Sequence, residues 1–307
     1  MWIKKMKNKR NQRGIAIVLV LWVSVLLTVI AGSFAYATRT DMSLVANHMQ
    51  RARAEAAADA GVHRAVLEAF RPISDPARWK HDGREHQLRL GEAEISVSVL
   101  DESAKIDIND GSPVLLRGLL LSLGLTEQES TRISDAIQDW RDADSLSRPA
   151  GAEEEAYRSA GLKQKPANAP FQTVEELRLV MGMTSDLYQR IEPMITIYSR
   201  QPGVNLTIAP REVLLAIPGV TPEQVDAFVS ARDAAVLANQ PAPTFPQAAT
   251  FGAVPNMIGL QVKSRARIGE IEFERLAVLK VIPDPRRPFA VLSWREGRSA
   301  VDMNAGT

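Results

Sequence analysis

The stretch Ile15–Ala37, IAIVLVLWVSVLLTVIAGSFAYA, runs for 23 residues without a charge. A helix of about 20 apolar residues is long enough to cross the hydrocarbon core of a bilayer. Six lysines and arginines precede the stretch, and the first acidic residue of the chain is Asp41. Because a basic flank stays on the cytoplasmic side, we expect residues 15–37 to cross a membrane once, with the body of the chain on the far side.

The helix is expected to continue beyond the membrane. Residues 41–70 contain one glycine and no proline, and seven of the fifteen residues 52–66 are alanine, the strongest helix former. The first stop signal is Arg71-Pro72. Val62, Val66 and Phe70 recur every four residues, which predicts a stripe that packs on a domain.

Two other interpretations of this N-terminus exist. A secretory signal cleaved after Ala35-Tyr36-Ala37 is possible, but such signals have an apolar core of about 7–15 residues, which is shorter than this one. A plain uncleaved signal anchor fits the length of the stretch.

The composition of the chain is that of a folded protein, and the motifs that it lacks argue against an enzyme. The chain has 307 residues, 45 % of them hydrophobic and 24 % charged, and no cysteine. The lack of cysteine excludes thiolate zinc sites, iron–sulfur clusters, thiol nucleophiles and disulfides. No G-x-S-x-G elbow, P-loop or H-E-x-x-H motif occurs. The four histidines, His48, His63, His81 and His86, fall on the expected helix or in a polar linker over residues 71–86, where we expect them to be solvated.

Strand patterns flank a long helical block. Apolar alternation predicts strands over residues 92–100, 105–109, 271–282 and 288–296, and helices dominate from 112 to about 237. This order favours an α+β domain with a helical domain inserted into it.

The helical block contains a weak repeat in which an apolar run is followed by glycine, an apolar residue and threonine. Glycine suits a left-handed helix ending, and threonine suits the N-cap of the next helix. The third copy also resembles a helix–hairpin–helix, a module that can bind nucleic-acid phosphate. Thr221 replaces the usual second glycine there, and no basic stripe surrounds it, so nucleic-acid binding is the weaker alternative. The copies are LLLSLGLTEQES (119–130), LRLVMGMTSDLY (177–188) and LLAIPGVTPEQV (214–225).

The most strongly charged segment is DAIQDWRDADSLSRPAGAEEEAY, residues 135–157. Residues 101–160 contain 13 acids and six bases. Oxygen ligands on a flexible loop suit calcium, and the absence of nearby histidine or cysteine disfavours transition metals. A solvated acidic loop is the alternative. A hydrolytic pair of Asp139 and Glu153 is disfavoured, because no sugar-binding aromatic pattern accompanies it.

The N-terminus resembles the class III signal of type IV pilins and pseudopilins. A basic leader ends at Arg13-Gly14, and the apolar stretch starts directly at Ile15. The resemblance implies cleavage by prepilin peptidase after Gly14 and methylation of Ile15. Most members carry glutamate at the fifth mature position, where this chain has Leu19, and in type II secretion that absence marks the minor pseudopilin K family. A carboxylate in the membrane is costly without a partner, and the first subunit of a pilus has no preceding amine to supply one.

The acidic segment resembles the K family as well, in D-W-x-D-x-D followed by Gly-Ala-Glu and tyrosine. The resemblance implies that the α-domain binds structural calcium. Three other residues in matching segments, Asp107, Asn109 and Asn205, are expected to be caps or turn formers. The ligands that the resemblance implies are Asp139, Asp142, Asp144, Glu153 and Glu154.

The resemblance implies a pseudopilin fold: a long N-terminal helix packed on an antiparallel sheet, with a large all-α insertion. The parts would be a cleaved leader (1–14), a transmembrane helix (15–37), its periplasmic continuation (38–72), the first part of the α/β domain (73–110), the inserted α-domain (111–240), and a loop with the C-terminal strands (241–307).

The implied role is that of a minor pseudopilin in the bacterial inner membrane, at the tip of the periplasmic pseudopilus, where it would initiate and cap assembly. The implied partners are the minor pseudopilins I and J, through them H and the major pseudopilin, prepilin peptidase, the inner-membrane assembly platform, and also the secretin and exported proteins, but no nucleic acid. A minor pilin of a type IV pilus or competence system is the closest alternative.

Overall fold

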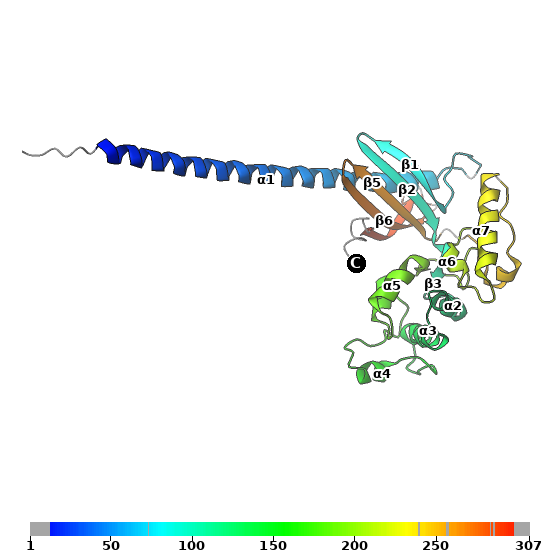
Figure 1. The fold of residues 1–307 in the computed structure, drawn as a ribbon. Helices are drawn as coiled ribbons and strands as arrows, with labels where there is room; N and C mark the ends of the chain where they lie inside the picture. The colour runs from blue at the N-terminus through cyan, green and yellow to red at the C-terminus, as the bar shows by residue number, and fades with distance from the viewer. Residues whose placement is uncertain are drawn as a thin grey trace, which may run out of the picture.

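The computed structural model describes residues 13–72, 74–238, 240–255, 258–282, 284 and 286–297. One long helix, α1 (Arg13–Ala69), extends away from a body that consists of a sheet and a helical domain (Figure 1). The first twelve residues of the predicted leader lie outside the described residues.

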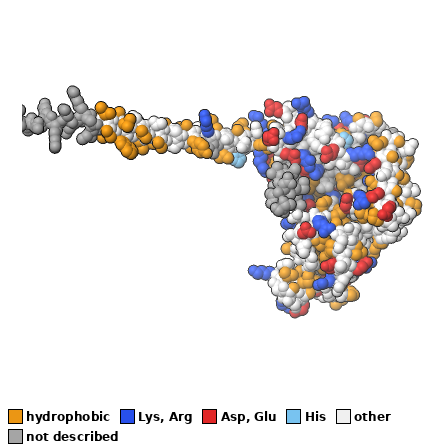
Figure 2. Space-filling model, in the orientation of Figure 1, with side chains coloured by type: hydrophobic (Ala, Val, Ile, Leu, Met, Phe, Trp, Pro, Cys, Tyr) orange, Lys and Arg blue, Asp and Glu red, His pale blue; other side chains and the backbone are white. Residues whose placement is uncertain are grey.

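Helix α1 has two parts with different surroundings. Its N-terminal part is long and apolar enough to cross a membrane, and its hydrophobic side chains lie exposed (Figure 2). Its C-terminal part packs on the sheet and buries small side chains such as Ala54, Ala58 and Val62. The helix ends at Ala69, which confirms the predicted stop. Phe70 is 44 % exposed, so its predicted place in the packing stripe is wrong.

The sheet has five antiparallel strands in the order β1-β2-β5-β6-β7. Strands β1 and β5 were not expected, and residues 82–86 were assigned to a linker, which is wrong. β1 reads DGREHQLRL and is an edge strand with polar residues on both faces, so it lacks an apolar period. The strands are β1 (Asp82–Leu90), β2 (Ala93–Asp101), β5 (Leu260–Ile268), β6 (Ile271–Val281) and β7 (Phe289–Glu296).

The helical domain is an insertion between two neighbouring strands. The chain leaves the sheet at Asp101 and returns at Leu260, which pairs with it. The insertion is therefore longer at both ends than the expected 111–240. Its elements are η1 (Glu102–Ala104), β3 (Ile106–Asp107), α2 (Pro113–Ser122), α3 (Glu127–Arg141), α4 (Glu154–Ser159), η2 (Val174–Leu179), α5 (Ser185–Ile191), η3 (Glu192–Met194), β4 (Ile195–Thr196), α6 (Arg211–Leu214), α7 (Pro222–Leu237) and η4 (Pro246–Phe251).

The expected strand over residues 105–109 is only two residues long. It is β3, and it pairs in parallel with β4 inside the insertion instead of joining the main sheet. Asp107 then acts as the expected turn former, because its Oδ1 accepts the N–H groups of Asn109 and Asp110 at 2.8 and 3.1 Å.

The glycine–threonine repeat marks three helix junctions, as predicted. Each glycine adopts positive φ, between 75° and 91°, which favours glycine over other residues. Each threonine caps the next helix by accepting a backbone N–H. The residue pairs are Gly124 and Thr126, Gly182 and Thr184, and Gly219 and Thr221.

Candidate metal centre

The acidic loop begins at the C-terminal end of α3, whose start is fixed by a capping box between Thr126 and Glu129. The buried face of α3 carries Ile133, Ile137 and Trp140 into the core of the α-domain. Asp139 is fully buried on the same helix, although it is a carboxylate. The loop closes over it so tightly that a Cβ at Gly151 would lie 2.0 Å from its Oδ2, so a larger residue there would have to displace the carboxylate.

An aromatic cluster anchors the loop to the core. The Trp140 ring stacks on Phe171 with ring centroids 6.0 Å apart and lies 6.3 Å from Tyr157. The Tyr157 hydroxyl oxygen accepts the N–H of Met181 at 2.8 Å. Burial raises the pKa of Tyr157 to about 12, so this hydroxyl stays neutral and adds no charge beside the carboxylates.

Four of the predicted ligands lie near one another. Burial raises the pKa of Glu153, and the charges of Asp139, Asp142 and Asp144 raise it further. Burial also raises the pKa of Asp139, although its oxygens accept the N–H of Arg148 at 3.3 Å. Each carboxylate in the cluster makes it harder for the others to ionise, so a nearby positive charge would stabilise the ionised cluster.

Two carboxylate oxygens in this cluster lack a hydrogen-bond partner among the described residues. They are Oδ1 of Asp142 and Oε1 of Glu153, and both are buried. Unpaired buried oxygens are rare, because each forfeits its hydration without compensation. A hard cation that prefers oxygen ligands would satisfy both.

Arg148 supplies the nearby positive charge. Its Nε lies 3.6 Å from Asp139 Oδ1, and its Nη2 lies 3.6 Å from Asp142 Oδ2, so the guanidinium is positioned between two carboxylates beyond hydrogen-bond distance. No motif in the sequence predicts this role for Arg148. The available signal was an arginine between two groups of acids within the acidic run.

Asp144 is held by a second loop. Its Oδ1 accepts the N–H of Leu146 at 2.8 Å, and its carbonyl oxygen accepts the side-chain amide of Asn168 at 2.7 Å. Asn168 has φ of 47°, a conformation that asparagine tolerates better than most residues. The segment around Asn168 therefore fixes the outer end of the acidic loop.

Glu154 lies apart from the other four predicted ligands. Its carboxylate forms ion pairs with Arg158 at 3.0 Å and Lys165 at 3.2 Å. The hydrogen bond from Lys165 is the largest cause that lowers its pKa.

The cluster fits a bound cation in chemistry but not as a ready-made cage. No three of the Asp, Glu and His side chains in the described residues are arranged to hold one ion in common. The orphaned oxygens of Asp142 and Glu153 and the raised pKa values nevertheless match an oxygen-ligated cation. Of the five predicted ligands, Asp139, Asp142, Asp144 and Glu153 interact electrostatically with one another, and calcium binding stays a prediction.

At the other end of the molecule, Gly14 and Ile15 lie in the first turn of α1. Leu19 lies in the apolar part of the helix with its side chain 61 % exposed. Cleavage after Gly14 and methylation of Ile15 stay predictions.

Known proteins are similar to this chain in sequence and in fold. A family model described as type II secretion system (T2SS), protein K, matches residues 97–200. Type II secretion system protein K of Klebsiella pneumoniae is 28 % identical over 67 % of this chain and 70 % of its own length. The protein K of Pseudomonas aeruginosa is 27 % identical over 73 % of each chain.

Among solved structures, a chain from the crystal structure of the GspK-GspI-GspJ complex of enterotoxigenic Escherichia coli has the same fold. It matches with a TM-score of 0.56 and 19 % identity, and the alignment covers 85 % of this chain and 99 % of that one. Together with the apolar N-terminal helix and the all-α insertion, these matches show that the chain is similar in sequence and in fold to the type II secretion system protein K family.

Proposed function

We propose that the protein sits at the tip of the periplasmic pseudopilus with the minor pseudopilins I and J, where it initiates and caps assembly. The observation that carries this proposal is the position of the α-domain, which projects from the sheet to one side of the α1 axis, with α7 at the end of the molecule farthest from the N-terminus of α1 (Figure 1). A body of that bulk leaves little room for another subunit above it. The related structure, in which GspK is bound to GspI and GspJ, supports the choice of partners.

In this proposal the protein is a structural subunit of the bacterial inner membrane and has no catalytic role. Residues 15–37 cross the membrane, the leader is cytoplasmic, and the sheet and α-domain are periplasmic. Prepilin peptidase removes residues 1–14, and the assembly platform receives the mature helix. Through I and J the protein contacts H and the major pseudopilin, and its exposed α-domain is the part that could meet the secretin and exported proteins.

The membrane-proximal stem supports helix packing with partner subunits. Between the membrane and the sheet, Met42, Val45 and Met49 are all more than half exposed. They follow a spacing of three and four residues, which places them on one face of the helix. Partner stems that enter the same membrane would cover that face.

We test this assignment on the full-length protein. Mass spectrometry of the mature chain is expected to show a methylated Ile15 at its N-terminus, and a start at Thr38 or Met1 would contradict it. Met49→Asp is expected to reduce co-purification with I and J at least tenfold. Leu146→Asp on the exposed acidic loop is the matched control and should leave co-purification unchanged.

We also propose that calcium binds Asp139, Asp142, Asp144 and Glu153 and makes the loop rigid. The bound ion would add positive charge to a cluster in which Arg148 lies 3.6 Å from Asp139 and from Asp142. Calcium accepts six to eight oxygen ligands in flexible geometry, so a loop without a preformed cage can still close around it.

Glu153→Gln separates this proposal from a solvated acidic loop. In a chelator the variant is expected to melt at a higher temperature than wild type, because it removes a buried charge. In calcium the order is expected to reverse, because the variant loses a ligand. Glu154→Gln, which alters a neighbouring carboxylate outside the cluster, should keep the wild-type response to calcium. A wild-type protein whose melting temperature ignores calcium would contradict the proposal.

A further inference from the structure

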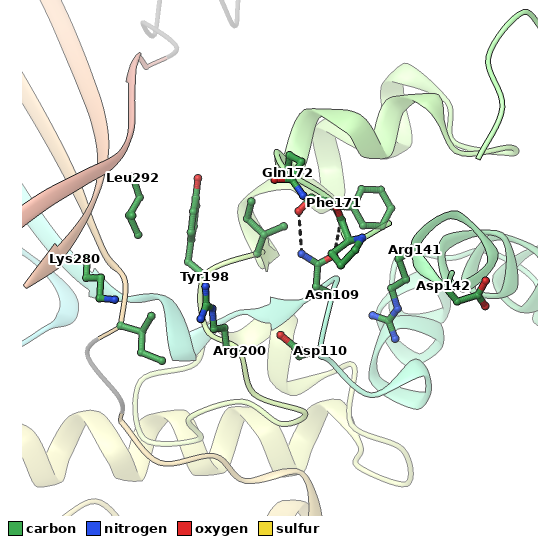
Figure 3. Close-up of a pocket in the computed structure, with 13 residues that line it drawn as sticks. Asn109, Asp110, Arg141, Asp142, Phe171, Gln172, Tyr198, Arg200, Lys280 and Leu292 are labelled. Atoms are coloured by element: carbon green, nitrogen blue, oxygen red, sulfur yellow. Dashed lines mark hydrogen bonds between the residues drawn. The ribbon is translucent and has the colours of Figure 1, made fainter. Parts of the chain in front are cut away.

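A cleft of about 560 Å³ lies between the α-domain and the sheet (Figure 3). Its volume is typical of ligand sites in proteins. Its walls come from segments far apart in the chain: the turn after β3, the end of α3, the loop before η2, the segment after β4, and strands β6 and β7.

One wall of the cleft is rigid and apolar. Asn109 donates its side-chain amide to the carbonyl of Phe171 at 3.0 Å and accepts the N–H of Phe171 at 2.8 Å. Phe171 is in turn stacked on Trp140. The wall is therefore already in place before any ligand arrives, which lowers the ordering cost of binding.

Two cations point into the same part of the cleft. Figure 3 shows Lys280 and Arg200 directed toward the space beside Tyr198. Neither side chain has an ion pair within 4.0 Å in the described part of the chain, although 22 such pairs occur elsewhere. Two like charges that face one space without a counter-ion attract an anion.

The acids of the cleft act on a different cation. The charges of Asp110 and Asp142 act on Arg141, which also donates to the carbonyl of Ile108 at 2.5 Å. In Figure 3 Asp110 is drawn between Arg200 and Arg141, and Asp142 lies beyond Arg141, so both acids line the Arg141 end of the cleft and Lys280 lies at the other end.

The backbone at Arg200 is held in an unusual conformation. Its φ is 51°, in the left-handed region that non-glycine residues seldom occupy. Its N–H donates to Oδ2 of Asp107 at 2.8 Å, and the same oxygen accepts the Ser199 hydroxyl at 3.2 Å. Asp107 is fully buried, so it fixes the conformation that places Arg200 at the cleft.

A β-bulge places an apolar side chain in the same cleft. In the β6–β7 pairing Val278 lies opposite Ser293, but the next residue, Leu279, lies opposite Val291. Leu292 is the extra residue, and the bulge leaves it lining the cleft at 38 % exposure. Bulges often redirect a side chain at functional positions.

We propose that this cleft binds an extended acidic segment of another protein, with a carboxylate between Lys280 and Arg200 and a neighbouring apolar side chain against Leu292. The charge of the cations selects a carboxylate, and the apolar wall selects a protein segment over a small free anion. The proposal requires neither calcium binding nor a position at the pilus tip.

The test uses the full-length protein in detergent micelles and two fluorescently labelled peptides, the acidic Ac-Leu-Glu-Leu-Glu-Leu-NH₂ and its neutral counterpart with glutamine in place of glutamate. Fluorescence anisotropy is expected to show at least tenfold tighter binding of the acidic peptide. The double variant Lys280→Gln, Arg200→Gln is expected to lose that preference, whereas Lys280→Arg keeps it.

Two further variants separate charge recognition from nonspecific binding. Reversal of both charges, Lys280→Glu with Arg200→Glu, is expected to transfer the preference to the corresponding lysine peptide. Leu292→Ser is expected to weaken binding of both the acidic and the neutral peptide at least threefold. Arg117→Gln, which removes an exposed arginine outside the cleft, is the control for loss of a positive charge elsewhere and should bind like wild type.

Three results would overturn the proposal. The first is equal affinity of the wild-type protein for the acidic and neutral peptides, and the second is a preference that survives the double glutamine variant. The third is competition by free glutamate at the concentration of the acidic peptide, which would identify a small-anion site. Each variant is used only if its melting temperature matches that of the wild-type protein.

Discussion

Two histidines near the start of the sheet, His81 and His86, lie in surroundings that the sequence did not predict. His86 was expected to be solvated, but its ring stacks on Trp79 with centroids 4.2 Å apart and planes 3° apart. Its Nε2 is buried and has no partner among the described residues. Burial lowers the pKa of His86 and also that of His81, which Arg78 lowers further.

These pKa shifts predict a loss of stability at acidic pH. Because the folded state lowers both pKa values below the usual value near 6.5, the unfolded chain binds protons more readily. The contribution of these two histidines to the free energy of unfolding is therefore fully present above about pH 6.5, and it is lost as the pH drops below that value. His86→Phe keeps the stack on Trp79 but cannot be protonated, so its melting temperature should fall less than that of wild type between pH 7 and pH 5.

The control for this prediction is His48→Phe, which alters an exposed histidine on α1. It should keep the wild-type pH dependence. A His86→Phe variant with the wild-type slope would show that the stacked histidine does not contribute to it.

At the scale of elements, the contact between α1 and the sheet depends on close approach. Gly61 lies in the buried face of the helix, where a Cβ would be 2.1 Å from Oγ of Ser264 and 2.9 Å from Cγ2 of Val97. The small side chains of Ser264 and Ala266 on β5 give the helix this space. Arg275 on β6 then pairs with Glu55 at 2.7 Å and Asp59 at 2.6 Å on α1.

Gly61→Val should force α1 away from the sheet. Overpacking of a close contact costs about 1–3 kcal/mol, so we expect a lower melting temperature for the sheet domain. Gly32→Val, at a helix position with nothing within 4 Å, is the control and should melt like wild type. Equal destabilisation by both variants would mean that valine acts through helix propensity and not through the contact.

Arg275→Met should also weaken the joint between α1 and the sheet. The substitution leaves Glu55 and Asp59 without their partner and removes cation–π contacts with Phe273 and Trp294. Because both carboxylates are partly exposed, we expect a loss of about 2 kcal/mol in chemical unfolding. Arg275→Lys should restore only part of the lost free energy of unfolding, because lysine lacks the guanidinium group that reaches both acids.

At the scale of the whole molecule, one arginine links the sheet to the inserted α-domain. Arg295 on β7 pairs with Glu175 at 2.7 Å, in η2, and with Glu192 at 2.5 Å, in η3. The cleft lies along the same junction, so its shape depends on how the two parts are held together.

Arg295→Gln should widen the range of orientations between the sheet and the α-domain. The native chain has no cysteine, so spin labels at Arg89→Cys on β1 and Lys163→Cys after α4 would be the only two. Electron paramagnetic resonance is expected to show a broader distance distribution in Arg295→Gln. Arg267→Gln, which breaks an exposed pair with Glu94 within the sheet, should leave the distribution unchanged.

Local patterns in the sequence determined the long helix, its stop before Arg71-Pro72, the three glycine–threonine junctions and the strands β2, β6 and β7. Each of these depends on residues within a few positions of one another, such as an apolar period or a cap. The sequence also determined that the acids concentrate in one loop, and its resemblance to the K family pointed to the correct fold.

Only the tertiary structure decided the rest, because it depends on contacts between distant segments. Strand β1 is polar and forms by pairing with β2, and β3 pairs across some 90 residues with β4. The burial of Asp139 follows from the return of the loop at Gly151, and the separation of Glu154 follows from its pairing with Lys165. The cleft unites Asn109, Arg200, Lys280 and Leu292, which no local period relates, because only folding brings them together.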